Sequence, residues 1–255
     1  MKTRQTKYWV VLLICLFGIT TLVFSQTYKK ELFSKANRKY EEGRYLQAIR
    51  LYEEILSLKG THADVFYNLG NAYFKENQFG KAILNYERAL MVDKRHKQAR
   101  ENLSILRSMI QDKEPFVKKM LLEIPFLLLK EHVTLKEILF FSMFLFWFIL
   151  AISLGLLFFK SQRKLFFRLT IILMIILIIS ILSGIIVFVN SDDNAGIVMI
   201  SEVPVLSGPG DTYSIRFKLH EGTKVFIQEK KYNWYHIYLI NKMSGWIREE
   251  SIEKI

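Results

Sequence analysis

The pattern of hydrophobic and polar residues divides the chain into stretches of different character. Residues 28–111 place apolar side chains at helical spacing, whereas residues 138–189 are almost continuously apolar. From residue 195 onward, short β-rich runs alternate with turns. Because each pattern favours a different structure, the sequence predicts a multidomain membrane protein. We expect an α-helical array, a transmembrane helix hairpin and a small all-β barrel.

Two uncharged, proline-free apolar runs, residues 138–159 and 169–189, predict the hairpin. At about 1.5 Å per residue, each run can cross a hydrocarbon core of roughly 30 Å as a helix. A pair of buried core helices is the alternative, but core helices of this length normally have a polar face. We therefore interpret both runs as membrane spans.

The connection between the two runs, residues 160–168, predicts their orientation. It carries Lys160, Arg163, Lys164 and Arg168 and no acidic residue, which is typical of a cytoplasmic loop. The residues on both sides of the hairpin would then lie outside the cytoplasm. We expect a multi-pass protein of the cytoplasmic (inner) membrane with both soluble domains on the periplasmic or extracytoplasmic side.

The first 25 residues predict an export signal. Lys2, Arg4 and Lys7 precede a long apolar run, and cleavage is expected after Ser25. An uncleaved membrane anchor is the alternative. Residue 26 emerges on the outer side in either case.

Residues 28–111 contain an internal repeat with a shift of 34 positions. This shift aligns apolar, aromatic and small residues in pairs: Leu32 with Phe66, Ala36 with Gly70, Tyr45 with Phe79, Ala48 with Ala82, Tyr52 with Tyr86, and Leu56 with Leu90. The period and the small residues between two helical faces resemble the tetratricopeptide repeat family. We expect repeats at 28–62 and 63–96, followed by a capping helix at 97–111. Gly70 and Ala82 are expected where two helices approach closely.

The first helix of each repeat carries a second pattern, an aromatic–Asn–aromatic trio on one face. The trios form a candidate partner-binding groove: Phe33, Asn37, Tyr40, Tyr67, Asn71 and Phe74. The family resemblance implies that this face lines a concave groove for extended peptides. Packing against neighbouring helices is the alternative. Gln98 and Asn102 stand where carboxyl-terminus-binding members have basic residues, so that specificity is not expected here.

Residues 112–137 predict a linker that lies on the membrane surface. The segment is apolar with scattered charges, and Pro125 interrupts any continuous helix.

The stretch 195–255 resembles a bacterial SH3-type domain. The resemblance rests on Leu219 followed by Gly222-Thr223 and Val225, and on the closing Gly245-Trp246-Ile247. It implies a ligand-binding barrel, often for cell-wall peptides, although Leu206 replaces an arginine common in the family. The candidate barrel surface consists of Tyr213, Trp234 and Trp246. A place in the barrel core is the favoured alternative for the two tryptophans.

Composition narrows the function classes. The net charge is +12. More than half of this excess lies in the signal and the cytoplasmic loop, and the rest is spread over helices, so we expect no nucleic-acid partner. The single cysteine, Cys15, lies in the signal segment, and the five histidines show no metal-ligand spacing. We expect no enzymatic activity, catalytic residue, metal or cofactor.

The order of signal, repeats, hairpin and barrel resembles the Bat (Bacteroides aerotolerance) group of bacterial membrane proteins. The resemblance implies partners among membrane-anchored von Willebrand A-domain proteins and a MoxR-type ATPase, with a role in aerotolerance or envelope stress. The first functional hypothesis is a membrane-anchored, non-catalytic protein-interaction scaffold. The alternative is a cell-wall sensor that binds peptidoglycan through the SH3-type domain, and a transporter or channel ranks last because neither span carries a charge.

Overall fold

The computed structural model describes residues 25–112, 133–158, 162–189 and 194–255. These residues form two compact units, one within Met1–Glu114 and Asn194–Ile255 and the other within Pro115–Asp193. Residues 1–24 of the predicted signal (1–25) and residues 113–132 of the predicted linker lie outside the described residues.

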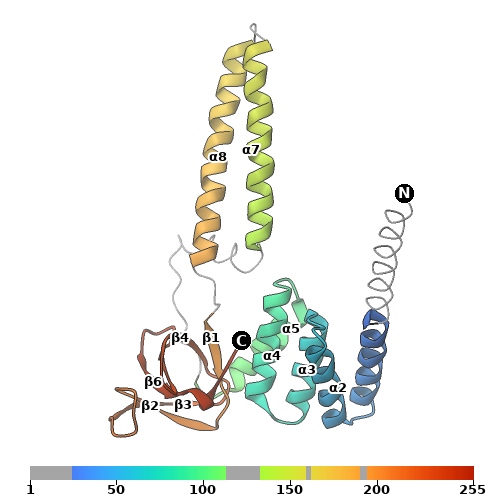
Figure 1. Cartoon of the computed structure of the whole chain (residues 1–255), viewed down its shortest axis with the longest axis vertical. Coiled ribbons are helices and arrows are strands. Elements are labelled where there is room, and N and C mark those ends of the chain that lie inside the picture. The colour runs from blue at the N-terminus through green and yellow to red at the C-terminus, as the bar shows by residue number, and fades with distance from the viewer. Residues whose placement is uncertain (1–24, 113–132, 159–161, 190–193) are drawn as a thin grey trace, which may run out of the picture. The chain divides into compact units, whose positions relative to one another are not determined.

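Residues 25–112 form the helical array. Residues 25–41 are helical and precede α2 (Tyr45–Ser57), α3 (Ala63–Lys75), α4 (Phe79–Val92) and α5 (Lys97–Met109), which stack side by side in Figure 1. The α3–α4 pair occupies the second predicted repeat, and α5 lies within the predicted capping segment. The predicted α-helical array is therefore confirmed.

The close approach of paired helices explains the small residues of the repeat. A Cβ atom added at Gly70 on α3 would lie only 2.7 Å from Cε1 of Tyr86 on α4. Ala82, on the facing side of α4, is completely buried. Tyr52 and Tyr86, which occupy the same repeat position, are each only 1% exposed.

The second unit contains two long antiparallel helices, α7 (Leu135–Phe158) and α8 (Arg163–Val189). Ser142 and Ser180 share a hydrogen bond of 2.8 Å between the helices. Both helices are long and apolar enough to cross a membrane by length and composition. Most of their large apolar side chains are exposed to the surroundings, as expected for helices that contact lipid.

Both helices begin earlier than the sequence analysis predicted. Helix α7 includes residues 135–137 of the predicted linker, and α8 includes Arg163, Lys164 and Arg168 of the predicted loop. A helix does not have to end where its charges begin, because long cationic side chains can extend from its first turns toward water.

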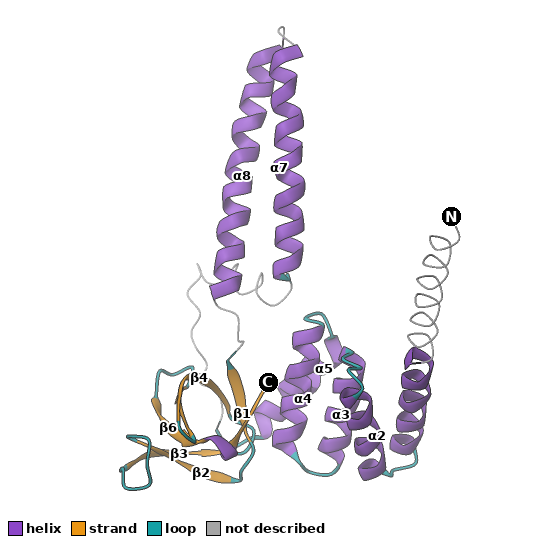
Figure 2. Ribbon diagram, in the orientation of Figure 1, coloured by secondary structure: helices purple, strands orange, loops and turns teal. Residues whose placement is uncertain are grey.

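The barrel is one antiparallel sheet of short strands (Figure 2). Its strands are β1 (Ala195–Val198), β2 (Glu202–Leu206), β3 (Ile215–His220), β4 (Lys224–Lys231), β5 (Trp234–Tyr238), β6 (Ser244–Arg248) and β7 (Ile252–Lys254). Their order is β3-β2-β6-β5-β4-β1-β7. The core is aliphatic and includes Val205, Val225, Ile237 and Ile247, none of which is exposed. This architecture confirms the predicted small all-β domain.

Candidate binding surfaces

The two groove asparagines are hydrogen-bond acceptors at equivalent places in the array. The Oδ1 atom of Asn37 accepts a hydrogen bond of 2.6 Å from the hydroxyl of Tyr52 on α2. The same oxygen accepts a second bond of 3.1 Å from Nδ2 of Asn68 on α3. Asn37 therefore joins three successive helices.

The second repeat contains the same arrangement. Oδ1 of Asn71 accepts from the Tyr86 hydroxyl at 2.7 Å and from Asn102 Nδ2 on α5 at 2.9 Å. Burial raises the pKa of both Tyr52 and Tyr86, so each hydroxyl stays protonated and donates. We call each set an Asn–Tyr–Asn clasp: Asn37, Tyr52 and Asn68 in the first, and Asn71, Tyr86 and Asn102 in the second.

The predicted aromatic residues of the groove are half-buried and contact other rings. Phe33 lies against Tyr52 with ring centroids 6.1 Å apart, and Tyr67 lies 6.0 Å from Tyr86. Tyr67 also lies 4.9 Å from the ring of His96, which is the N-cap of α5. Tyr40 and Phe74 make similar contacts with Tyr45 and Phe79.

The aromatic residues of the predicted groove thus contribute to packing and keep part of each ring exposed. Together with the clasps they recur at equivalent positions in the two repeats. Sequence reasoning singled out Asn37 and Asn71 but missed the roles of Asn68 and Asn102. The signal was available, because Asn68 and Asn102 are separated by the same shift of 34 residues as the other clasp members.

The candidate barrel surface is assembled from the loop after β2 and from strands β5 and β6. Along β5, Tyr235 and Ile237 point into the core, so Trp234 and His236 lie on the opposite face. Trp246 on β6 is paired with His236, and their ring centroids are 4.9 Å apart. The favoured expectation that Trp234 and Trp246 belong to the barrel core is therefore wrong.

Arg248 connects the loop to this face. Its guanidinium group lies 5.3 Å from the Trp234 ring and is within 2.6 Å of the Asp211 carboxylate. In the same loop, the half-exposed ring of Tyr213 covers Gly208 so closely that a Cβ there would be 2.4 Å from a ring carbon. Trp234 and Trp246 thus lie on one partly exposed face of the barrel, and Tyr213 lies in the loop that Arg248 connects to this face.

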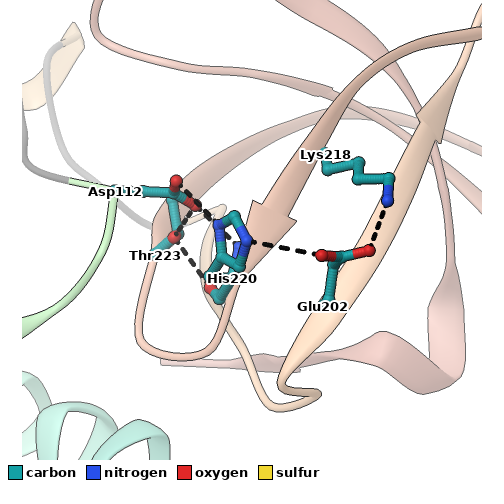
Figure 3. Close-up of polar contacts among 5 residues, drawn as sticks. All are labelled: Asp112, Glu202, Lys218, His220 and Thr223. Atoms are coloured by element: carbon teal, nitrogen blue, oxygen red, sulfur yellow. Dashed lines mark hydrogen bonds and ion pairs between the residues drawn. The ribbon is translucent and has the colours of Figure 1, made fainter.

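The array and the barrel also share a cluster of polar contacts, shown in Figure 3. The Asp112 carboxylate, just beyond α5, accepts hydrogen bonds from the His220 backbone N–H at 2.7 Å and from the Thr223 hydroxyl at 2.8 Å. Its other oxygen lies 2.9 Å from His220 Nδ1. On the far side of the ring, His220 Nε2 is 3.7 Å from Glu202, which also pairs with Lys218.

These contacts determine the ionisation of Asp112. Burial acts to raise its pKa, but the hydrogen bonds from His220 and Thr223 outweigh burial and lower the pKa below its ordinary value. Asp112 is therefore an anionic acceptor at neutral pH. The sequence analysis did not identify this residue, because its partners are more than 100 positions away.

Among the described residues, no group of three or more His, Cys, Asp or Glu side chains is arranged to hold a metal ion. The surfaces that the structure does present consist of aromatic, amide and ion-paired groups. Such groups suit the recognition of other molecules.

Comparisons with known proteins agree with the two kinds of domain. Residues 63–96 match the tetratricopeptide repeat family, residues 36–77 match a second TPR repeat family, and residues 200–254 match the bacterial SH3 domain family. A comparison with curated protein sequences finds no match.

Three of the solved structures similar to this chain are tetratricopeptide domains. The Arabidopsis OM64 TPR domain is 21% identical, with a TM-score of 0.32, and the match covers 33% of this chain and 70% of that one. The second TPR of Spaghetti (RPAP3), bound to an HSP90 peptide, is 22% identical with a TM-score of 0.31, over 32% and 75% of the two chains. The Sgt2 TPR domain from Aspergillus fumigatus is 29% identical with a TM-score of 0.30, over 31% and 53%. By the family matches alone, the chain contains tetratricopeptide repeats and a bacterial SH3 domain, and the structure adds two apolar helices long enough to cross a membrane.

Proposed function

We propose that the chain is a membrane-anchored, non-catalytic scaffold that binds protein partners outside the cytoplasm. The observation that carries this proposal is the repeated row of half-exposed aromatic rings and asparagines along the array. The Asn37 and Asn71 oxygens are occupied by the clasps, whereas their side-chain N–H groups donate no hydrogen bond within the described residues. These groups are suited to bind main-chain carbonyls of an extended segment, with Phe33 and Tyr67 contacting its side chains.

The partners proposed for this groove follow from the resemblance to the Bat group. We propose a BatE-type role in a complex with membrane-anchored von Willebrand A-domain proteins and a MoxR-type ATPase, linked to aerotolerance or envelope stress. The cationic connection between α7 and α8 supports an arrangement in which the array and the barrel face the periplasm.

Crosslinking in intact membranes tests the scaffold directly. The full-length tagged protein is crosslinked, purified and analysed by mass spectrometry, in parallel with Tyr67→Ala. The control is Tyr232→Ala, because Tyr232 is 82% exposed at a barrel turn. We expect Tyr67→Ala to lose partners that the wild type and the control retain. Equal recovery from all three proteins would contradict a binding role for the groove.

A cell-wall binder is the second candidate, and the surface of Tyr213, Trp234 and Trp246 favours it. Exposed aromatic rings can stack on sugars or peptides, and Arg248 adds a cation. The test is sedimentation of the detergent-solubilised full-length protein with purified peptidoglycan. Binding that is lost in Trp246→Ala but kept in Tyr232→Ala would support this function, and failure of the wild type to sediment would exclude it.

A further inference from the structure

We propose that the barrel is the C-terminal cap of the helical array, in the place that the second helix of a third repeat would take. This inference concerns how the two domains work together and is independent of which ligand either one binds. Repeat arrays need a terminal element that covers the last exposed face, because each repeat buries its apolar surface only against its neighbours.

Equivalent isoleucines in the two repeats are both well covered. Ile49 on α2 and Ile83 on α4 are 34 positions apart, and they are 6% and 0% exposed. Ile49 belongs to the first repeat, which has a following repeat to cover it. Ile83 belongs to the last helix pair, yet it is at least as well buried.

The residue that covers Ile83 comes from the barrel. A Cβ atom added at Gly222, in the β3–β4 turn, would lie 2.7 Å from Ile83 Cδ1 and 3.0 Å from Ile110 Cγ2. Gly222 also has a φ of +88°, which favours glycine. The turn therefore fits closely against the end of the array. It covers Ile83, which the second helix of a third repeat would otherwise be expected to cover.

A contact made by a glutamate recurs with the same 34-residue period. Glu53 on α2 accepts a hydrogen bond from Tyr73 on α3, and the equivalent Glu87 on α4 pairs with Arg107 on α5. In the second case the barrel adds a further partner, because Lys224 Nζ lies 3.2 Å from Glu87 Oε2. Both the Glu87 and Lys224 side chains are only 10% exposed. Each buried ion therefore needs its charged partners to offset the free energy of the hydration that it has lost.

The apolar residues of the barrel are divided between two hydrophobic cores. Ile197 of β1 is fully buried and belongs to the core of the array, and Met199 and Ile255 pack against that same core. The remaining barrel residues, including Val225 and Ile247, form a separate core. The barrel thus contributes some apolar side chains to the core of the array and others to its own core.

Polar contacts fix the edges of the same interface. Gly80 N–H at the start of α4 donates to the Glu221 carboxylate at 2.8 Å. Arg88 donates to the Lys254 carbonyl at 2.7 Å and pairs with Glu253 at 3.1 Å. With the Asp112 contacts, these bonds surround the apolar centre formed by Ile83, Ile110 and Gly222. Such an enclosed interface is typical of a permanent packing surface.

Hydrogen–deuterium exchange on the full-length protein in detergent tests the cap. Lys224→Ala removes a barrel partner of Glu87, and Lys230→Ala is the matched control. Lys230 lies on the same strand and pairs with Glu249 inside the barrel. We expect Lys224→Ala to accelerate exchange in peptides of α4 and α5 by about tenfold or more, because the buried Glu87 carboxylate loses one of the two cations that offset its desolvation. Lys230→Ala should leave α4 and α5 unchanged.

Exchange that rises only in the barrel, or equally in both variants, would overturn the proposal. If Lys224→Ala does not fold, the pair Asp112→Asn and Glu202→Gln provides the same comparison. Asp112 bridges the two domains, whereas Glu202 contacts His220 from within the barrel. Acceleration in α5 with Asp112→Asn alone supports the cap, and no difference between these two variants contradicts it.

Discussion

At the scale of single residues, the array is organised by asparagine side chains that hold three helices at once. Each clasp uses one amide oxygen for two donors, a tyrosine hydroxyl and a second asparagine. Removal of the oxygen leaves the hydroxyl of a buried tyrosine without its acceptor, which costs more than an ordinary hydrogen bond. The same asparagine can therefore be needed for folding and be exposed to a ligand.

Replacement of the central asparagine should reveal this structural role. We expect Asn71→Ala to lower the free energy of unfolding by about 1–3 kcal/mol, because Tyr86 and Asn102 both lose their acceptor. Denaturant unfolding of the full-length protein in detergent, followed by circular dichroism, measures the change. Gln98→Ala is the control, since Gln98 is exposed on α5. A loss no larger than that of the control would show that the clasp does not stabilise the array.

Asp112 gives the interface a dependence on acid. Because its pKa is lowered in the folded protein, its stabilising effect is complete above the unfolded pKa of about 3.9 and is lost as the pH falls through the lower folded value. We expect Asp112→Asn to be less stable than wild type at pH 6 and to show a smaller further loss on acidification to pH 3. Urea unfolding at the two pH values measures this. Parallel losses in both proteins would contradict the assignment.

At the scale of elements, the helices could be predicted because their signals are long and periodic. The 34-residue shift indicated a helical array where α3 and α4 lie, and two uninterrupted apolar runs indicated α7 and α8, although both helices begin earlier than those runs. The barrel was harder, because short strands leave the inward and outward faces ambiguous. The outward positions of Trp234 and Trp246 became clear only when pairing fixed which residues of β5 and β6 face the core.

The α3–α4 contact provides an element-scale prediction. Gly70→Val should destabilise the array by about 1–3 kcal/mol, because the new side chain must displace the buried Tyr86 ring. Thermal unfolding followed by circular dichroism measures the effect. Gly210→Ala is the control, since its Cβ would make an ordinary contact of 3.4 Å with Tyr213. An unchanged Gly70→Val protein would mean that the two helices can move apart at no cost.

At the scale of the whole molecule, contacts between residues far apart in sequence could not be predicted. Nothing near Asp112 or Glu87 in the chain indicates His220 or Lys224 as a partner, because the hairpin separates them. Local periodicity describes each domain by itself, whereas the interface depends on shape and charge that only the folded chain brings together. The proposed account is therefore one array-plus-barrel head attached to a helical hairpin.

The most direct measurement of this account is the sidedness of the head and the hairpin connection. Single cysteines in a Cys15→Ser background are introduced at Ser57 in the array, Asn241 in the barrel and Ser161 between the spans. They are then treated with a membrane-impermeant maleimide in spheroplasts. The account predicts that the cysteines at 57 and 241 react in intact spheroplasts, while the cysteine at 161 reacts only after permeabilisation. Labelling of the cysteines at 57 and 241 on opposite sides of the membrane would contradict this account. Labelling of the cysteine at 161 in intact spheroplasts would contradict it as well.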